Sequence, residues 1–311
     1  MRVVSLLPSA TEIVYALGAE PVGVSHECDY PPAARGVPAV NRSRVDPDAT
    51  SAEINEQVAA AIEEGGVYEL DRERLAALDP DLVVSQGICD VCAVDEVLVR
   101  TAVDELGLDA EVLTTDPHSM ADVLADVERI GATLGRGERA SEVVADLQER
   151  VAAVEEAATG VEERPDVAVL DWLDPPMVAG HWVPGMVERA GGRYGLAAPG
   201  ERSRPREWAE VREYDPDVLV AAPCGFDLDQ TGANLTDLTG REGWADLQAV
   251  REGRVYAVDG HHYVNRPGPR LVDTLECLGA LFHPDRFADP PGDAVQPVSA
   301  LADEPGAGAL Q

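Results

Sequence analysis

The residues best suited to chemistry lie in two short stretches of the chain. Ser85–Val94 carries Cys89 and Cys92 in a C-x-x-C spacing, and an upstream loop carries His26 and Cys28. Thiolates and imidazoles are the donors that zinc-like ions prefer, so His26 and the three cysteines could bind zinc or iron if the two loops meet. The C-x-x-C could instead be a redox pair, or two small apolar side chains that fill a tight loop. The sequence leaves these alternatives open.

A second set of candidates carries rings. His181 and Trp182 stand at a loop-to-helix junction, Trp172 follows one predicted strand, and His261 and His262 follow another. Aromatic walls would stabilise a planar macrocycle, and an imidazole could ligate cobalt or iron at its centre. The alternative is that the indoles pack beneath the surface and the imidazoles are solvated.

Motifs of catalysis are absent from the sequence. It contains no nucleophile elbow, no glycine-rich dinucleotide fingerprint and no phosphate-binding loop. We therefore expect a binding protein and not an enzyme. A thiol- and histidine-dependent metal protein or enzyme on the same scaffold is the alternative.

Apolar strands alternate with amphipathic helices along the chain. Ser9–Glu12 has the residues of a capping box, which predicts a helix that begins there. An apolar stripe over Gly137–Ala158 predicts one helix about 33 Å long. The alternation predicts an α/β fold of two Rossmann-like lobes joined by this long helix. The expected parts are an N-terminal lobe over 1–136, an interlobe helix over 137–160, a C-terminal lobe over 161–287 and an acidic, mobile tail over 288–311.

A weak internal repeat supports two related lobes. Glu73–Val84 and Trp208–Val220 both read as a helix, an Asp-Pro-Asp break and a buried strand. Open α/β sheets place their ligands at the carboxyl ends of the strands, which predicts a binding cleft between the lobes. The residues expected to contact the ligand are His26, Glu27, Cys28, Asp29, Tyr30, Gln86, Cys89, Cys92, Trp172, His181, Trp182, His261 and His262.

The charge of the chain is extreme. Its 311 residues carry a formal net charge of −34, and all 24 basic residues are arginine. An acidic, lysine-free surface on an ordinary apolar core is typical of a halophilic protein that stays soluble at high salt. It excludes nucleic acid as a partner, because no basic patch remains.

Targeting signals are also missing. The first residues lack the regions of a signal peptide, and no apolar stretch approaches the ~18 residues that a membrane span needs. As written, we expect a monomeric cytoplasmic protein. If translation starts upstream of Met1, the protein would instead be extracytoplasmic and membrane-associated.

Several motifs together resemble a known family. Ser5–Glu12, Val22–Ser25, Asp29–Pro32, Leu75–Val84 and Gly191-Gly192 are similar to the helical-backbone periplasmic binding proteins, and within them to the cobalamin-binding (corrinoid) branch. The HECDYP and C-x-x-C-A-V motifs resemble a subgroup of that branch that starts without a leader.

The resemblance implies both a fold and a function. The fold is that of class III substrate-binding proteins, and the function is capture of a corrinoid or similar metal chelate between the lobes for ABC-type import. No cofactor is required, and the partners are the chelate, an ABC permease and its ATPase. Glu73 and Glu188 match the positions at which importer-linked members dock onto permease arginines.

Overall fold

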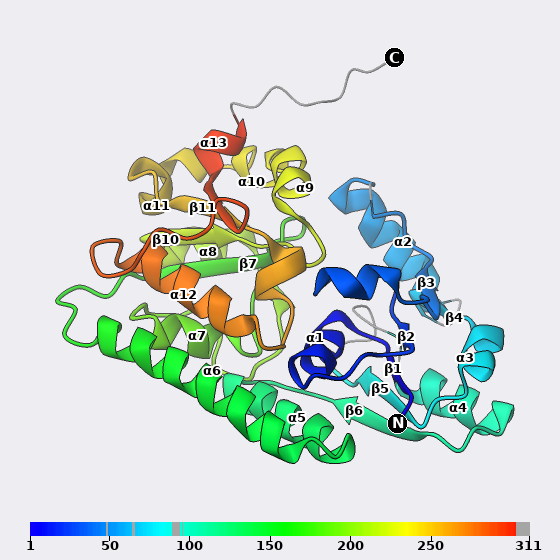
Figure 1. The fold of residues 1–311 in the computed structure, drawn as a ribbon. Helices are drawn as coiled ribbons and strands as arrows, with labels where there is room; N and C mark the ends of the chain where they lie inside the picture. The colour runs from blue at the N-terminus through cyan, green and yellow to red at the C-terminus, as the bar shows by residue number, and fades with distance from the viewer. Residues whose placement is uncertain (48, 64–65, 89–93, 95, 303–311) are drawn as a thin grey trace. The chain divides into compact units, whose positions relative to one another are not determined.

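The computed structural model describes residues 1–47, 49–63, 66–88, 94 and 96–302. The chain forms two compact units, of which unit 1 comprises residues 1–117 and 121–147, and unit 2 comprises residues 118–120 and 148–311. Each unit is built of strands and helices in alternation (Figure 1). The expected α/β fold class is therefore confirmed. Among the described residues, none of the helices has both the length and the apolar character of a membrane span.

Unit 1 contains a parallel sheet of four strands in the order β2-β1-β5-β6. The central strand β5 is buried along its whole length, as expected for a parallel strand covered on both faces. Strands β3 and β4 form a separate antiparallel pair, and in the chain they come between β2 and β5. The elements are β1 (Val3–Ser5), α1 (Pro8–Ala16), β2 (Gly23–Val24), the 3-10 helix η1 (Pro32–Gly36), β3 (Asn41–Ser43), α2 (Ser51–Glu63), β4 (Tyr68–Leu70), α3 (Arg72–Leu78), β5 (Leu82–Gln86), α4 (Glu96–Leu106), β6 (Glu111–Thr115) and α5 (Met120–Thr133).

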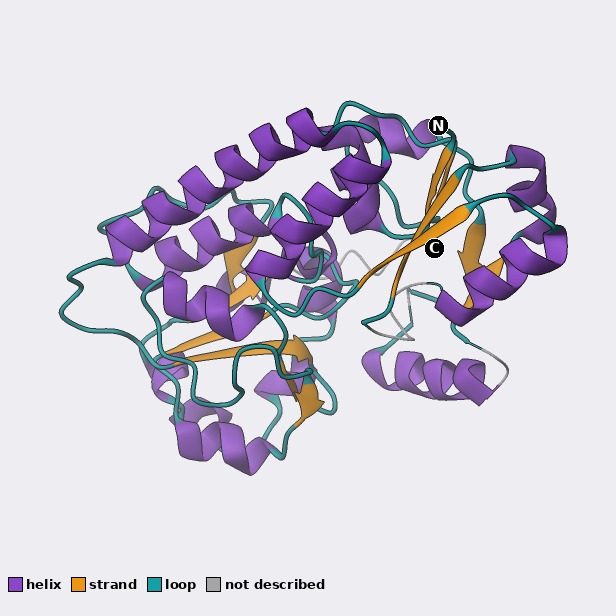
Figure 2. Ribbon diagram, turned by 90° about the horizontal axis from the view of Figure 1, so that it is seen from below, coloured by secondary structure: helices purple, strands orange, loops and turns teal. Residues whose placement is uncertain are grey.

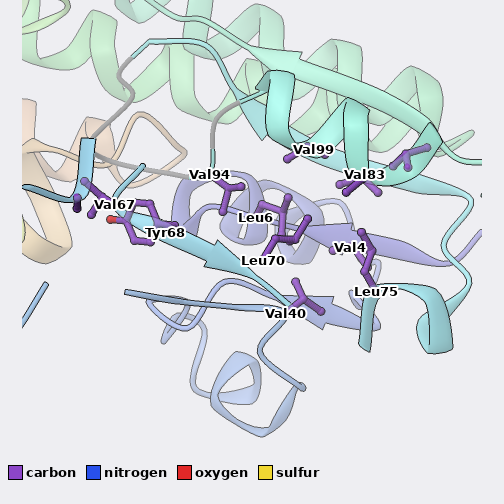
Figure 3. Packing of buried hydrophobic residues seen from close by; sticks show 13 residues of the cluster. Val4, Leu6, Val40, Val67, Tyr68, Leu70, Leu75, Val83, Val94 and Val99 are labelled. Carbon is purple, nitrogen blue, oxygen red and sulfur yellow. The ribbon is translucent and has the colours of Figure 1, made fainter. Parts of the chain in front are cut away.

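The core of unit 1 joins side chains from both sets of strands. Leu6 follows β1, Leu70 ends β4 and Leu75 lies in α3, and all three are buried in one cluster (Figure 3). The ring of Tyr68 belongs to the same cluster, which anchors a phenol at the start of β4. This packing fixes the positions of β3 and β4 in unit 1.

The start of α1 differs from the prediction. The helix begins at Pro8, and its N-cap is Leu7, which makes no side-chain hydrogen bond. Proline is well suited to the first turn of a helix, because its missing N–H would have no partner there. Ser9 is therefore inside the helix, and the predicted capping box is wrong.

Unit 2 contains a sheet of six strands in the order β12-β11-β10-β7-β8-β9. Its centre is parallel, because β10 pairs in parallel with both β7 and β11. In the view of Figure 1, α7 and α12 lie below β7 and β10, and α9, α11 and α13 lie above them. The elements are β7 (Val167–Trp172), β8 (Met177–Val178), α7 (Val183–Arg189), β9 (Arg204–Pro205), α8 (Trp208–Tyr214), β10 (Val218–Ala221), α9 (Leu228–Ala233), α10 (Thr236–Thr239), the 3-10 helix η2 (Trp244–Asp246), α11 (Gln248–Arg251), β11 (Val255–Val258), the π-helical turn η3 (Gly260–Val264), α12 (Leu271–Phe282), β12 (Val295–Pro297) and α13 (Val298–Ala302).

The segment predicted to be a tail adds to the sheet of unit 2. Strand β12 pairs antiparallel with β11, with Val295 opposite Val258. Val295 and Val298 are buried, so this acidic segment still supplies apolar side chains to the core. The prediction of a mobile tail was wrong here, because the overall composition of residues 288–311 gives no sign of these few buried apolar positions.

Helix α6 (Gly137–Ala158) has the bounds that the apolar stripe predicted. It is one unbroken helix (Figure 2). The division between the two compact units falls between its residues Leu147 and Gln148. The residues of its stripe, Ala140, Val143, Val144, Leu147, Val151 and Val154, are all buried.

Candidate functional site

Three loops of unit 2 meet at the carboxyl ends of β7, β10 and β11. The backbone N–H groups of Gly260 and His261 both donate to the carbonyl of Phe226, at 3.0 Å each. The ring of Trp172, at the end of β7, lies 5.2 Å from the ring of Phe226. A Cβ at Gly260 would lie 2.8 Å from the carbonyl oxygen of Ala222, so only glycine lets these loops approach so closely. We call this set of loops the unit 2 face.

The turn η3 holds two imidazoles in fixed orientations. Asp259 accepts hydrogen bonds from the backbone N–H and from Nδ1 of His262, at 2.7 Å each. A carboxylate can only accept, so Nδ1 of His262 carries the hydrogen and Nε2 carries the lone pair. Nε2 of His261 accepts from the guanidinium of Arg266 at 2.8 Å. Both Asp259 and Arg266 are buried, so each ring is held from beneath by a buried charge.

Turn η3 also carries Tyr263, whose phenol is neutral near pH 7. Burial, followed by the nearby carboxylate of Asp293, raises the pKa of Tyr263 above its usual value. Tyr263 therefore presents an O–H group at neutral pH.

His181 and Trp182 belong to the loop between β8 and α7. Trp182 is buried, and its Nε1 donates to the carbonyl of Val264 at 2.9 Å, which ties this loop to η3. The Nδ1 atom of His181 lies 3.3 Å from Nδ1 of His118, so one of the two rings donates to the other. His181 has a φ of +52°, an uncommon conformation for a residue that is not glycine. Such conformations cluster at functional sites.

His118 is a residue that sequence reasoning missed. It stands just before α5 and 63 positions from His181 in the chain, so by position alone it reads as a surface or helix-end residue. No local pattern in the sequence signals that contact. In the structure, the segment 118–120 belongs to unit 2.

Unit 1 carries the second group of predicted residues. His26 lies 3.8 Å from the carboxylate of Glu27, measured from Nε2 to Oε1, and its ring lies 5.6 Å from that of Tyr68. The hydroxyl of Tyr68 donates to the same Oε1 at 3.2 Å. Asn41 accepts from the backbone N–H of His26 at 2.9 Å.

Cys28 is buried, and its Sγ lies 3.1 Å from Oγ1 of Thr11. The hydroxyl of Thr11 in turn donates to Ser5 at 2.9 Å. The thiol is thus part of a buried chain of small polar groups between β1, α1 and the loop after β2. Its predicted partners in a metal site, Cys89 and Cys92, lie outside the described residues.

Other predicted residues are spread over unit 1. Asp29 is half-buried and Tyr30 is exposed. Gln86 is buried at the end of β5, and its Nε2 has no hydrogen-bond partner within the described part of the chain. Because Gln86 ends a parallel strand, its amide stands where ligands bind to sheets of this kind.

The two predicted docking residues, and one further cysteine, lie outside both groups. Glu73 in α3 and Glu188 in α7 are exposed. Cys277 is buried in the apolar run of α12, and burial raises the pKa of its thiol to about 12. It therefore remains a thiol and acts as a small apolar side chain.

The comparisons with known proteins agree with this fold. A sequence model of the family described as periplasmic binding protein matches residues 3–261. The chain is 25% identical over 298 residues to an uncharacterised ABC transporter substrate-binding lipoprotein of Bacillus subtilis, covering 93% of this chain and 82% of that protein. It is 26% identical over 289 residues to a cobalamin-binding protein of Halobacterium salinarum, covering 91% of this chain and 69% of that protein.

Solved structures show the same fold. A periplasmic haem-binding protein of Pseudomonas aeruginosa is 25% identical with a TM-score of 0.69, covering 93% of this chain and 95% of that one. An ABC transporter substrate-binding protein of Listeria monocytogenes is 18% identical with a TM-score of 0.70, covering 91% and 98% of the two chains. A vitamin B12-binding protein of Vibrio cholerae is 19% identical with a TM-score of 0.64, covering 90% and 96%.

Proposed function

Because the chain belongs to the periplasmic binding protein family of ABC transporter substrate-binding proteins, we propose that it binds a corrinoid or a similar planar metal chelate for import. The observation that carries this proposal is the unit 2 face. There, aromatic and imidazole side chains from separate loops gather at the carboxyl ends of parallel strands.

The chemistry of the unit 2 face suits a metal macrocycle. Trp172 is half-buried and is held on Phe226, so the pair offers an aromatic surface with little entropy left to lose on binding. His262 offers an Nε2 lone pair whose direction is fixed by Asp259. A carboxylate behind an imidazole makes the ring a better donor to cobalt or iron. His181 is a second imidazole donor near this face.

The relatives favour a chelate as the ligand. The halobacterial relative is named a cobalamin-binding protein, and the solved relative from Pseudomonas aeruginosa is named a haem-binding protein. Both names refer to planar tetrapyrrole-type rings around a metal ion. We place cobalamin first, because the motifs around His26 and Gln86 resemble the corrinoid branch.

The alternative of a thiol-dependent metal protein has weaker support. It required Cys28 to supply a thiolate. In the structure, Sγ of Cys28 contacts the hydroxyl of Thr11 and is buried in unit 1. A buried thiol of this kind is unreactive.

The proposal is tested by titrating the purified chain with cobalamin and with haemin. Binding is followed by calorimetry and by the visible spectrum of the chelate. We expect sub-micromolar binding of one of the two, and a tenfold or greater loss of affinity in Trp172→Ala. The matched control is Trp208→Ala, which removes an indole that unit 2 stacks against Trp244 and not against Phe226. Absence of heat and of a spectral change with both chelates would overturn the proposal.

The spectrum also tests the role of His262. If its Nε2 binds the metal, His262→Ala changes the visible bands of the bound chelate as well as the affinity. The control is His283→Ala, since His283 contacts the carbonyl of Gly191.

A further inference from the structure

The cluster of His26, Glu27, Asn41 and Tyr68 in unit 1 carries chemistry that the unit 2 face does not use. Asn41 is 5% exposed and fixes the imidazole. The backbone N–H of His26 donates to one atom of the Asn41 amide, so that atom is the oxygen, Oδ1. Nδ1 of His26 lies 3.2 Å from the same oxygen and must therefore carry its hydrogen. In the neutral ring, the lone pair is then on Nε2.

Nε2 of His26 faces a second acceptor. It lies 3.8 Å from Oε1 of Glu27. Both atoms can bind a cation, so a proton on the ring or a metal ion could lie between them. A proton shared between imidazolium and carboxylate gives a distance of about 2.7–2.9 Å. Two ligands of one metal ion, each about 2.0–2.2 Å from it, can be as far apart as the observed pair.

Tyr68 supplies a third possible metal ligand beside Glu27. Its hydroxyl lies 3.2 Å from Oε1 of Glu27. Its ring is anchored in the core of unit 1, with the hydroxyl turned away from Leu6 and Leu70 (Figure 3). The phenol is therefore held in position before any ion binds, and ordering it costs little.

The donor set selects the class of metal. An imidazole nitrogen, a carboxylate oxygen and a phenol oxygen form a hard to borderline set without sulfur, because the thiol of Cys28 is directed at Thr11. A phenol binds a metal as phenolate, and phenolate is a ligand of iron in proteins. We propose that His26, Glu27 and Tyr68 bind one ferric ion, with Asn41 as the residue that orients His26.

Binding is balanced without redox chemistry. The imidazole and the carboxylate bind in the forms that they already have, and Tyr68 releases one proton to solvent. The side chains of His26 and Glu27 are 28% and 34% exposed, so water or a small anion can fill the other positions of the ion. The net charge of −34 raises the local concentration of cations.

The experiment uses the full chain, stripped of metal with a chelator and then titrated with ferric citrate. We expect one iron per chain by elemental analysis and a visible phenolate-to-iron charge-transfer band. Tyr68→Phe should abolish the band and weaken iron binding at least tenfold. Asn41→Ala should weaken binding by about 10–100-fold while the band remains, as for other residues that orient a metal ligand.

Two controls separate this site from its alternatives. Tyr30→Phe changes another tyrosine of unit 1, and Cys28→Ser changes the nearby thiol, so both should keep the band. A band that survives Tyr68→Phe, stoichiometric zinc binding without iron binding, or no metal binding at all would overturn the proposal. The cobalamin and haemin titrations are read through Trp172 and His262 of unit 2, and the iron titration through Tyr68 of unit 1, so the failure of one proposal is distinguishable from the failure of the other.

Discussion

Asp79 in unit 1 and Asp215 in unit 2 end their helices in the same left-handed backbone conformation. Asp79 has φ and ψ of 41° and 64°, and Asp215 has 44° and 65°. Each precedes a proline and a buried parallel strand, so the Asp-Pro-Asp repeat in the sequence corresponds to a repeat in the structure. The third residue of each repeat also has the same contact: Asp81 accepts from the backbone N–H of Arg2, and Asp217 from that of Asp166.

We expect Asp79→Gly to stabilise the protein and Asp215→Gly to do so less or not at all. A left-handed conformation costs a non-glycine residue about 1 kcal/mol, which glycine avoids. Asp215 also accepts from the backbone N–H of Gln248 at 2.7 Å, and glycine would remove that bond. The free energy of unfolding, measured with urea, should rise by about 0.5–1 kcal/mol for Asp79→Gly. A larger gain for Asp215→Gly would contradict this account.

Asp126 in α5 makes stability depend on pH. Burial is the main reason that the pKa of this carboxyl rises to about 6, and its partner Arg129 only partly opposes it. The folded state therefore holds the proton more tightly than the unfolded state, whose pKa is near 3.8. The contribution of Asp126 is fully present below about pH 4 and is lost as the pH rises through about 6.

Asp126→Asn should remove that loss. We expect the variant and the parent to be similar in stability at pH 4, and the variant to be more stable by about 1–3 kcal/mol at pH 7. The measurement is the free energy of unfolding at a series of pH values. Glu128→Gln, an exposed neighbour in the same helix, should show no such pH-dependent difference. An equal gain at pH 4 and pH 7 would exclude the titration of Asp126 as the cause.

The fold was predictable where the apolar pattern is long. Helix α6 has 22 residues, or about six turns, and its bounds in the structure match the prediction. Strands β8, β9 and β12 have two or three residues each, too few to show a period of two. All three pair antiparallel with their neighbours, and β9 and β12 are the edge strands of the sheet. Their existence depends on neighbouring strands and not on local sequence.

The candidate site was predictable only in part. Rings and thiols after predicted strands are visible in the sequence, and Trp172 and His261 are on the unit 2 face. Contacts that decide their chemistry join distant positions, such as Asn41 with His26, or Thr11 with Cys28. A single sequence carries no signal for such pairs. For this reason, the tautomers and the burial of the thiol emerged only from the structure.

Gly180 is expected to control the position of His181. A Cβ at this residue would lie 2.6 Å from the backbone of Arg202 and of Ser203, so the segment must move. The backbone N–H of His181 donates to Glu201 in that segment, and the histidine should move with it. Gly180→Ala should lower the free energy of unfolding by about 1–3 kcal/mol.

The same variant should weaken chelate binding if His181 contributes to it. The control is Gly185→Ala in α7, where a Cβ meets nothing within 4 Å and alanine favours the helix. That control should be slightly more stable than the parent and should bind the chelate as the parent does. Unchanged stability of Gly180→Ala would contradict this prediction, because the segment 201–203 would then move at little cost in free energy.

Glu73 and Glu188 are expected to mediate docking to the permease. Both are exposed on helices, one in each unit, and both match positions that the family resemblance assigns to docking. Exposed charges contribute to encounter and orientation more than to stability. The double change Glu73→Arg and Glu188→Arg should therefore leave the unfolding free energy and the chelate affinity unchanged.

Transport should respond very differently from binding. In proteoliposomes that contain the cognate permease and ATPase, we expect the double variant to reduce chelate uptake at least tenfold, because like charges would face the arginines of the permease. Added salt should weaken docking of the parent by screening the same charges. The control is Glu138→Arg with Glu213→Arg, which makes the same change of net charge at two other exposed helical positions, one in each unit. Equal loss of uptake in both double variants would attribute the effect to net charge and not to docking by Glu73 and Glu188.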